Sequence, residues 1–293
     1  MESLTRIELA LTAAIAAAEA RGAPPKLAAG LRHAVFPGGA RIRPLLCVAV
    51  AQACGDDDPG LSDAAAAAIE LLHCASLVHD DLPCFDDAQT RRGKASVHRA
   101  FGERIAVLTG DALIVLAFQS LAGAAGRSPQ RLAPLLATLA GGVGMPHGIV
   151  AGQAWECEPR VALRDYQRAK TGALFAAATA AGALAAGAEP APWRAFGDCL
   201  GEAYQVADDI RDVAADPDLL GKPMGRDLAL GRPSVATEQG LEGAIRHFDA
   251  LVLRARDAVP ECRGAPRLRA LVGMESERLV PKALTAELAR IAA

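Results

Sequence analysis

Four aspartates crowd the short segment 79–87, which follows an apolar stretch typical of a helix. Carboxylates this close raise one another's pKa or require cations, and oxygen ligands of this kind suit Mg²⁺, which bridges to substrate phosphates. Pro83 disfavours a helical Leu82 and should end the helix, so that the chain can fold back. In an unbroken helix Asp80 and Asp86 would lie about 600° apart on different faces, so this break is what could bring both to one ion.

A second acidic segment, 205–212, comes near the end of another long apolar run. Asp208 and Asp212 are four positions apart there and would share one helix face. One such cluster alone is more often a solvated acidic helix end than a metal site. Each cluster, however, is trailed by basic residues: Arg91, Arg92 and Lys94 after the first, and Lys222, Arg226 and Arg232 after the second. Carboxylates for a metal together with cations for phosphate predict a diphosphate-binding site.

The elements that must position these groups are predicted to be helices. Ala, Leu, Glu and Arg dominate, aromatic residues are only 4%, and alternating β-branched runs are absent, which favours an all-α fold. Ser62 or Asp63 would cap the third helix, and Pro44 suits the first turn of the second. The breaks are short Gly/Pro clusters, which predicts one domain over residues 1–293. The predicted helices span residues 4–20, 44–53, 62–79, 103–122, 131–140, 145–155, 163–186 and 192–213.

Composition excludes several classes of protein. A chain of 293 residues with 52% hydrophobic content can bury a large core, and its formal charge of −3 predicts neither nucleic-acid binding nor a polybasic membrane signal. The uncharged run 171–188 is mostly Ala and Gly, which predicts close helix packing and no membrane span. The N-terminus lacks a secretory pattern and the seven cysteines are scattered, so we predict a reduced, cytoplasmic protein.

Over residues 31–234 the chain resembles the trans-isoprenyl diphosphate synthases, the polyprenyl synthetase family, and most closely its bacterial carotenoid-pathway geranylgeranyl diphosphate synthases. Four signatures carry the resemblance: GGARIRP at 38–44, HDDLPCFDDAQTRRG at 79–93, KTGALF at 170–175 and QVADDIRD at 205–212. The resemblance implies a bundle of long helices around a deep central cavity, the isoprenoid synthase fold, usually as a homodimer. The two aspartate motifs would face each other across the cavity mouth.

The resemblance also implies roles for individual residues. Mg²⁺ ions would hold the allylic diphosphate through Asp80, Asp81, Asp86, Asp208, Asp209 and Asp212, assisted by Arg91, Lys170, Gln205 and Lys222. Thr171 would lie beside the allylic carbon. The diphosphate of isopentenyl diphosphate would be bound by Arg43, His73 and Arg92, and Arg232 would also bind substrate. Dimethylallyl, geranyl or farnesyl diphosphate would be ionised, attacked by the isopentenyl double bond and deprotonated, without an enzyme nucleophile.

Two features of this chain bear on substrate affinity and product length. The family pattern usually has Lys third in the first signature, where this chain has Ala40, and Arg41 or Lys94 could compensate. Gln153 and Glu156 resemble another family element and would orient Lys170. In the family, the side chain five residues before the first Asp helps to set the cavity floor. Small residues there, Ala75 and Ser76, predict geranylgeranyl diphosphate as the main product, with Phe118 either stopping growth or simply packing in the core.

Three alternatives remain open. A terpene cyclase would bind no second diphosphate, which the isopentenyl-site cations oppose. A non-catalytic subunit of a heteromeric synthase gains support from Ala40, although both aspartate motifs are present. A farnesyl diphosphate synthase is the third alternative, and the small side chain of Ala75 is the main feature that argues against it.

Overall fold

The computed structural model describes residues 2–36, 38–160, 162–214 and 235–280, and helices make up most of this part of the chain. The first half contains α1 (Ser3–Ala18), α2 (Pro25–Val35), α3 (Ile42–Ala53), α4 (Pro59–Asp80), α5 (Val97–Phe101), α6 (Glu103–Ala124), η1 (Pro129–Arg131) and α7 (Leu132–Val143). The second half contains α8 (Ile149–Trp155), α9 (Leu163–Gln167), η2 (Arg168–Gly172), α10 (Ala173–Ala185), α11 (Ala191–Ala214), α14 (Val235–Asp257) and α15 (Ala265–Leu279). The prediction of an all-α fold is confirmed.

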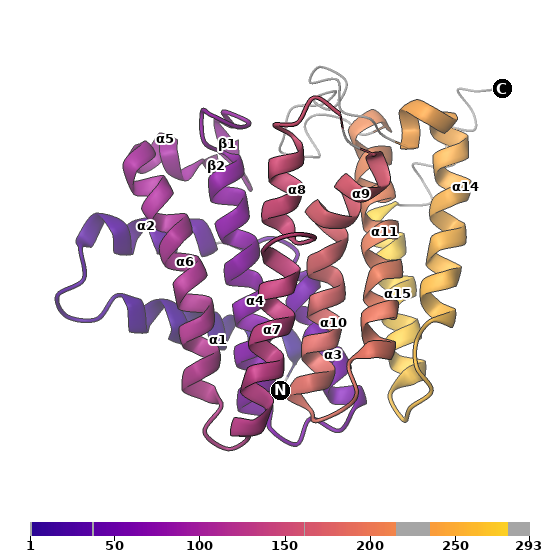
Figure 1. Cartoon of the computed structure of the whole chain (residues 1–293), viewed down its shortest axis with the longest axis horizontal. Coiled ribbons are helices and arrows are strands. Elements are labelled where there is room, and N and C mark those ends of the chain that lie inside the picture. Colours follow the sequence, from indigo (N-terminus) through magenta and orange to yellow (C-terminus); the bar gives the residue numbers. More distant parts are fainter. Residues whose placement is uncertain (1, 37, 161, 215–234, 281–293) are drawn as a thin grey trace.

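Helix α4 runs through the centre of the molecule between α6, α3 and α10 (Figure 1). It buries most of its length in the main hydrophobic core, as an almost continuous apolar run requires. Helix α10 is rich in alanine and packs closely on its neighbours: a Cβ added to Gly182 would lie 2.2 Å from the carbonyl oxygen of Cys47 on α3. The close helix packing predicted for the uncharged run is therefore confirmed.

Several local predictions differ from the structure. Helix α4 begins at Pro59, where Asp58 accepts a hydrogen bond from the amide of Leu61, so the prediction of Ser62 or Asp63 as its cap is wrong. Proline at the first helical position and aspartate before it are the stronger start signal. Ser62 and Asp63 instead bind Arg6 of α1, the latter at 2.8 Å. Helix α2 and the hairpin of β1 (Thr90–Arg91) and β2 (Lys94–Ala95) were not predicted.

The predicted continuous helix 163–186 is also wrong, because it is divided into α9, η2 and α10. The middle segment, η2, is π-helical. Inserted turns of this kind are frequent at functional sites, since they turn side chains away from the regular helical positions. Figure 1 shows α8, α9 and the hairpin at one end of the bundle, and the two aspartate motifs lie at this end.

Candidate active site

Asp80 lies at the end of α4 and points toward α8 and η2. Its Oδ1 accepts a hydrogen bond of 3.0 Å from Gln153 of α8 and lies 3.9 Å from Lys170 Nζ of η2. Only 8% of the residue is exposed. Burial raises the pKa of Asp80, the charges of Glu156 and Asp86 raise it further, and Lys170 opposes them. A buried carboxylate among like charges is the environment that a bound cation would relieve.

The chain folds back after α4, as Pro83 predicts. The amide of Asp86 donates a hydrogen bond of 2.9 Å to the carbonyl oxygen of Asp80, and the amide of Ala88 donates one of 3.1 Å to that of Asp81. This reversal brings Asp86 near Asp80, where its charge helps to raise the pKa of Asp80. The backbone reversal therefore brings Asp86 close to the end of α4.

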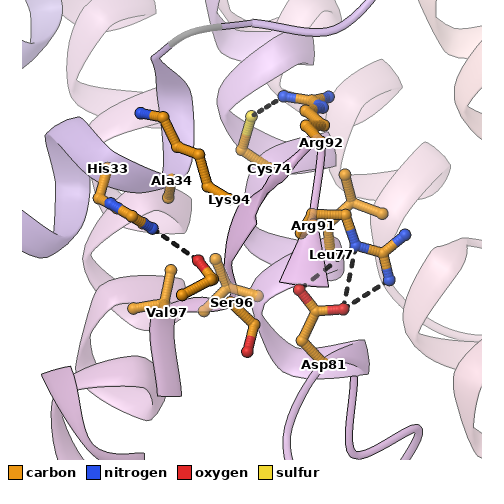
Figure 2. A pocket seen from close by; sticks show the side chains of 12 residues that line it. His33, Ala34, Cys74, Leu77, Asp81, Arg91, Arg92, Lys94, Ser96 and Val97 are labelled. Carbon is orange, nitrogen blue, oxygen red and sulfur yellow. Dashed lines mark hydrogen bonds and ion pairs between the residues drawn. The ribbon is translucent and has the colours of Figure 1, made fainter. Parts of the chain in front are cut away.

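Asp81 points in a different direction from Asp80. Its carboxylate pairs with Arg91 of β1, which donates from Nε at 3.0 Å and from Nη2 at 2.5 Å, at the edge of a hollow between α2, α4 and the hairpin (Figure 2). Burial raises the pKa of Asp81, and the hydrogen bond from Arg91 opposes that effect. Of the two adjacent aspartates, Asp80 is thus directed to α8 and η2 and Asp81 to the hairpin.

The second motif lies on α11. Asp209 is 2% exposed and accepts hydrogen bonds from Gln205 at 2.9 Å, from Gln167 at 3.3 Å and from the amide of Val235 at 2.9 Å. Its neighbour Asp208 is more exposed and pairs with Arg211 at 2.8 Å. Asp209 thus ties α11 to the start of α14 and to α9, whereas Asp208 faces a more open space.

Lys170 and Thr171 of η2 connect the two motifs. Lys170 donates to Glu156 of α8 at 2.5 Å and lies near Asp80, and Thr171 donates to Gln205 of α11 at 2.7 Å. The α8 backbone approaches η2 so closely that a Cβ on Gly152 would lie 2.4 Å from the Cα of Lys170. The predicted contact of Glu156 with Lys170 is therefore present, while Gln153 binds Asp80 and not Lys170.

The side chains predicted to bind isopentenyl diphosphate gather around His73 of α4. Arg43 Nη1 lies 3.4 Å from His73 Nε2, and its guanidinium stands over the rings of Phe175 and Tyr204, with centroids 4.5 Å and 5.4 Å away. Burial lowers the pKa of His73 well below its ordinary value, and the nearby guanidinium groups, that of Arg43 first, lower it further. The imidazole is therefore neutral at neutral pH.

Arg92 approaches this group from the hairpin. Its guanidinium reaches Glu70 at 3.3 Å and the Cys74 thiol at 3.7 Å. Arg41 is buried and held by Glu8 at 2.8 Å and by Glu70 at 2.6 Å. The suggestion that Arg41 compensates for Ala40 is therefore wrong, because its guanidinium is already engaged in the protein interior.

Other predicted residues are placed as follows. Ala75 is 1% exposed in the main core, and the hydroxyl of Ser76 donates to the carbonyl oxygen of His73 at 2.8 Å. Phe118 packs against the main core from its edge. Lys222, Arg226 and Arg232 lie outside the described residues, as does the side chain of Asp212. Within the part of the chain that the structure describes, no group of three or more His, Cys, Asp or Glu residues is arranged to hold a metal ion.

Glu70 is a site residue that sequence reasoning missed. Its carboxylate, 2% exposed, accepts from both Arg41 and Arg92. The signal was present in the sequence, since a single glutamate within an otherwise apolar helical run must be paired if it is buried.

The chain is similar to known proteins in both sequence and structure. A family model described as polyprenyl synthetase matches residues 24–259. A geranylgeranyl diphosphate synthase of Cereibacter sphaeroides is 54% identical, and one of Rhodobacter capsulatus is 47% identical; each alignment covers 96% of this chain and 98% of the relative. A Helicobacter pylori geranyltransferase structure, complexed with magnesium and isoprenyl diphosphate, superposes with a TM-score of 0.73 at 27% identity, over 99% of this chain and 98% of that one.

Proposed function

Because the chain belongs to the polyprenyl synthetase family, we propose that its two aspartate motifs hold Mg²⁺ against the diphosphate of an allylic substrate. The chain is a prenyltransferase that condenses isopentenyl diphosphate with allylic diphosphates, and its product is geranylgeranyl diphosphate. The observation that carries the proposal is the connection from Asp80 through Lys170 and Thr171 to Gln205 on α11, which joins the motifs at one end of the bundle.

The residues present fit magnesium. Asp80, Asp86 and Asp208 supply the hard oxygen atoms that this ion prefers, and a cation would offset the like charges of Glu156 and Asp86 around buried Asp80. Mg²⁺ bound there would neutralise negative charge on the diphosphate as it departs. Asp212 remains part of this proposed set. Asp209, with three hydrogen-bond donors around its carboxylate, is better suited to holding α11 in place.

The protein's own cations have separate proposed tasks. Lys170 and Arg91, with Lys222, would bind the allylic diphosphate, and the hydroxyl of Thr171, oriented by Gln205, would face the allylic carbon. Arg43, His73 and Arg92, with Arg232, would bind isopentenyl diphosphate. Breaking of the allylic carbon–oxygen bond would precede attack by the isopentenyl double bond, and the released diphosphate would take the proton. Alignment of two substrates in a site shielded from water would supply most of the rate.

The decisive test is an assay of the purified chain alone. Labelled isopentenyl diphosphate is supplied with dimethylallyl, geranyl or farnesyl diphosphate, with and without Mg²⁺, and product length is read by chromatography. We expect elongation to the twenty-carbon product only with Mg²⁺ present. Absence of any elongation would instead support a non-catalytic subunit, and accumulation of the fifteen-carbon product would support a farnesyl diphosphate synthase.

Product length is proposed to depend on Ala75, one and a half helical turns before Asp80. A tyrosine there would fill space beneath the metal site. We therefore predict that Ala75→Tyr shortens the main product from twenty to fifteen carbons, as measured by chromatography of the dephosphorylated products. Ala68→Ser, a small change about two helical turns before Ala75, should leave product length unchanged. Continued formation of mostly twenty-carbon product by Ala75→Tyr would remove Ala75 from the cavity floor.

We also propose a homodimer and a cytoplasmic location. Helix α6 carries exposed apolar side chains, Val107, Leu108 and Val115, which a second copy could cover. By length and composition alone α4 and α6 could each cross a membrane, but a core helix passes the same test, and α4 is 72% buried over its apolar window. All seven cysteines are free thiols, which supports a reducing compartment.

A further inference from the structure

The β1–β2 hairpin is fastened to α4 by two charged contacts. Arg91 pairs with Asp81 through two of its nitrogens, and the next residue, Arg92, pairs with Glu70 at 3.3 Å. Figure 2 shows Arg91 turned toward Asp81 and Arg92 turned the opposite way, toward Cys74. Both carboxylates are 2% exposed, whereas the two arginine side chains keep 30% and 20% of their surface exposed. The acids are therefore buried, and the two arginine side chains stay partly exposed.

The spacing of the two acids on α4 explains this arrangement. Glu70 and Asp81 are eleven residues apart, about 1,100° of helical rotation, which is three turns and a further 20°. They therefore share one face of α4, the face that carries the hairpin. Asp80 is displaced from Asp81 by about 100° and faces Gln153 and Lys170 instead.

We propose that Asp81 and Glu70 are positioning residues that orient Arg91 for the allylic diphosphate and Arg92 for isopentenyl diphosphate, respectively. The inference rests on the proposed function and assigns to each acid one substrate of the same site. It also removes Asp81 from the proposed metal ligands, since its carboxylate is directed to the hairpin and not to the second aspartate motif.

Positioning of this kind has a physical basis. A free arginine side chain samples many rotamers, and ordering it only when a ligand binds weakens the binding. A carboxylate that accepts from one part of the guanidinium leaves the remaining N–H donors free to point at phosphate oxygens. Glu70 accepts from Arg41 as well as from Arg92, and Arg41 is also paired with Glu8, so Arg92 does not have the charge of Glu70 to itself.

The test separates the two substrates kinetically. We expect Asp81→Asn to raise the KM for the allylic diphosphate by about 10- to 100-fold while the KM for isopentenyl diphosphate changes less than about twofold. Glu70→Gln should show the reverse pattern. Binding of Mn²⁺ in place of Mg²⁺, followed by electron paramagnetic resonance, should be unchanged in Asp81→Asn and reduced in Asp80→Asn.

Two further sets of variants complete the test. Asp63→Asn breaks another partly buried pair on α4, with Arg6 at 2.8 Å, and should lower the melting temperature without changing either KM. If Glu70→Gln does not fold because Arg41 loses its partner, Arg92→Lys and Arg91→Lys should reproduce the same separation. A parallel rise of both KM values in each variant, or loss of Mn²⁺ binding in Asp81→Asn, would overturn the proposal. An inactive wild-type chain would refute the proposed function itself.

Discussion

At the scale of single residues, the proposed isopentenyl diphosphate site places a neutral imidazole among guanidinium groups. His73 lies 3.4 Å from Arg43, and the charges of Arg92, Arg91 and Arg41 also act on it. Burial lowers the pKa of His73, and it is lowered further because a protonated imidazole would add like charge to this group. A neutral His73 can accept a hydrogen bond from Arg43 and so hold its guanidinium still.

This lowered pKa has a measurable consequence for stability. In the unfolded chain His73 binds a proton below its ordinary pKa of 6.5, while in the folded protein it does not. The free energy of unfolding should therefore fall as pH drops below this value, by at most about 1.4 kcal/mol per pH unit from this one group. We predict that His73→Gln reduces that loss by about 1 kcal/mol between about pH 6.5 and pH 5.5, as measured by urea unfolding. An equal loss in both proteins would mean that His73 titrates normally.

A second residue-scale prediction concerns the charge missing at Ala40. Lys94 Nζ donates to the carbonyl oxygen of Phe36 at 2.7 Å and lines the same hollow as Arg92 (Figure 2). Its ammonium thus lies near the segment that carries Ala40. Loss of a charged hydrogen bond worth about 1.5–3 kcal/mol predicts that Lys94→Ala raises the KM for isopentenyl diphosphate by roughly 10- to 100-fold.

The reverse substitution makes this prediction specific. In the double variant, Ala40→Lys should restore most of the affinity for isopentenyl diphosphate that Lys94→Ala removes, because a lysine at position 40 supplies the missing positive charge. Lys26→Ala, an exposed lysine on α2, is the matched control and should change nothing. If the double variant binds isopentenyl diphosphate no better than Lys94→Ala, the two positions do not share a ligand.

Many residues of the candidate site could be predicted from their types and spacing in the sequence. The directions in which their side chains point could not. The motifs place Asp80 and Asp81 side by side, and only the packed neighbours decide that one faces Gln153 and the other faces Arg91. Glu70 pairs with residues 29 and 22 positions away, one on each side along the chain. Such long-range pairing is a tertiary property, which helical periodicity alone cannot specify.

At the scale of elements, the contact between α8 and η2 sets the position of Lys170. A Cβ on Gly152 would meet backbone atoms of Lys170 at 2.4 Å, and backbone cannot yield as a flexible side chain would. We predict that Gly152→Ala displaces the helices, lowers kcat by about 100-fold and destabilises the protein by about 1–3 kcal/mol. Steady-state kinetics and thermal unfolding measure the two effects.

A neighbouring glycine supplies the control for this contact. Gly141 on α7 has nothing within 4 Å of an added Cβ, so Gly141→Ala should keep full activity and gain about 0.5–1 kcal/mol. Normal activity in Gly152→Ala would show that the close approach is not needed to position Lys170.

The long helices could be predicted from composition. The π-helical turn η2 and the short β1–β2 hairpin could not. Helix-favouring composition and the Gly/Pro breaks located α1, α3, α4, α6 and α11 within a few residues. The π-helical turn at η2 has no comparable local signal, because the run 163–186 contains no proline that would break a helix. The two-residue strands of the hairpin are too short for an alternating pattern to appear, and contacts with α4 hold them in place.

At the scale of the whole molecule, α6 presents an apolar surface that intramolecular packing leaves uncovered. Leu108 is 50% exposed and Val115 55% exposed on this helix. We predict that the wild-type chain is a dimer and that Leu108→Glu shifts it toward monomer, because a buried charge at an interface opposes association. Light scattering after size exclusion measures the mass, and circular dichroism checks that the helices remain.

An equally exposed leucine elsewhere tests whether the effect is local. Leu253 on α14 is 60% exposed, and Leu253→Glu should leave the dimer intact. A monomeric wild-type chain, or equal loss of the dimer in both variants, would contradict the assignment of α6 as the interface.

The pairing of Asp80 with Lys170 also matters while the chain is being synthesised. Ninety residues separate the two, so a ribosome adding about 5–20 residues per second needs roughly 5–18 seconds to deliver the lysine after the aspartate has emerged. During that interval the apolar surface that α4 buries against later helices is uncovered, and Asp80 lacks Lys170 as its partner. Nascent chains halted before residue 170 should therefore be preferred clients of chaperones, and chains released after α11 should not.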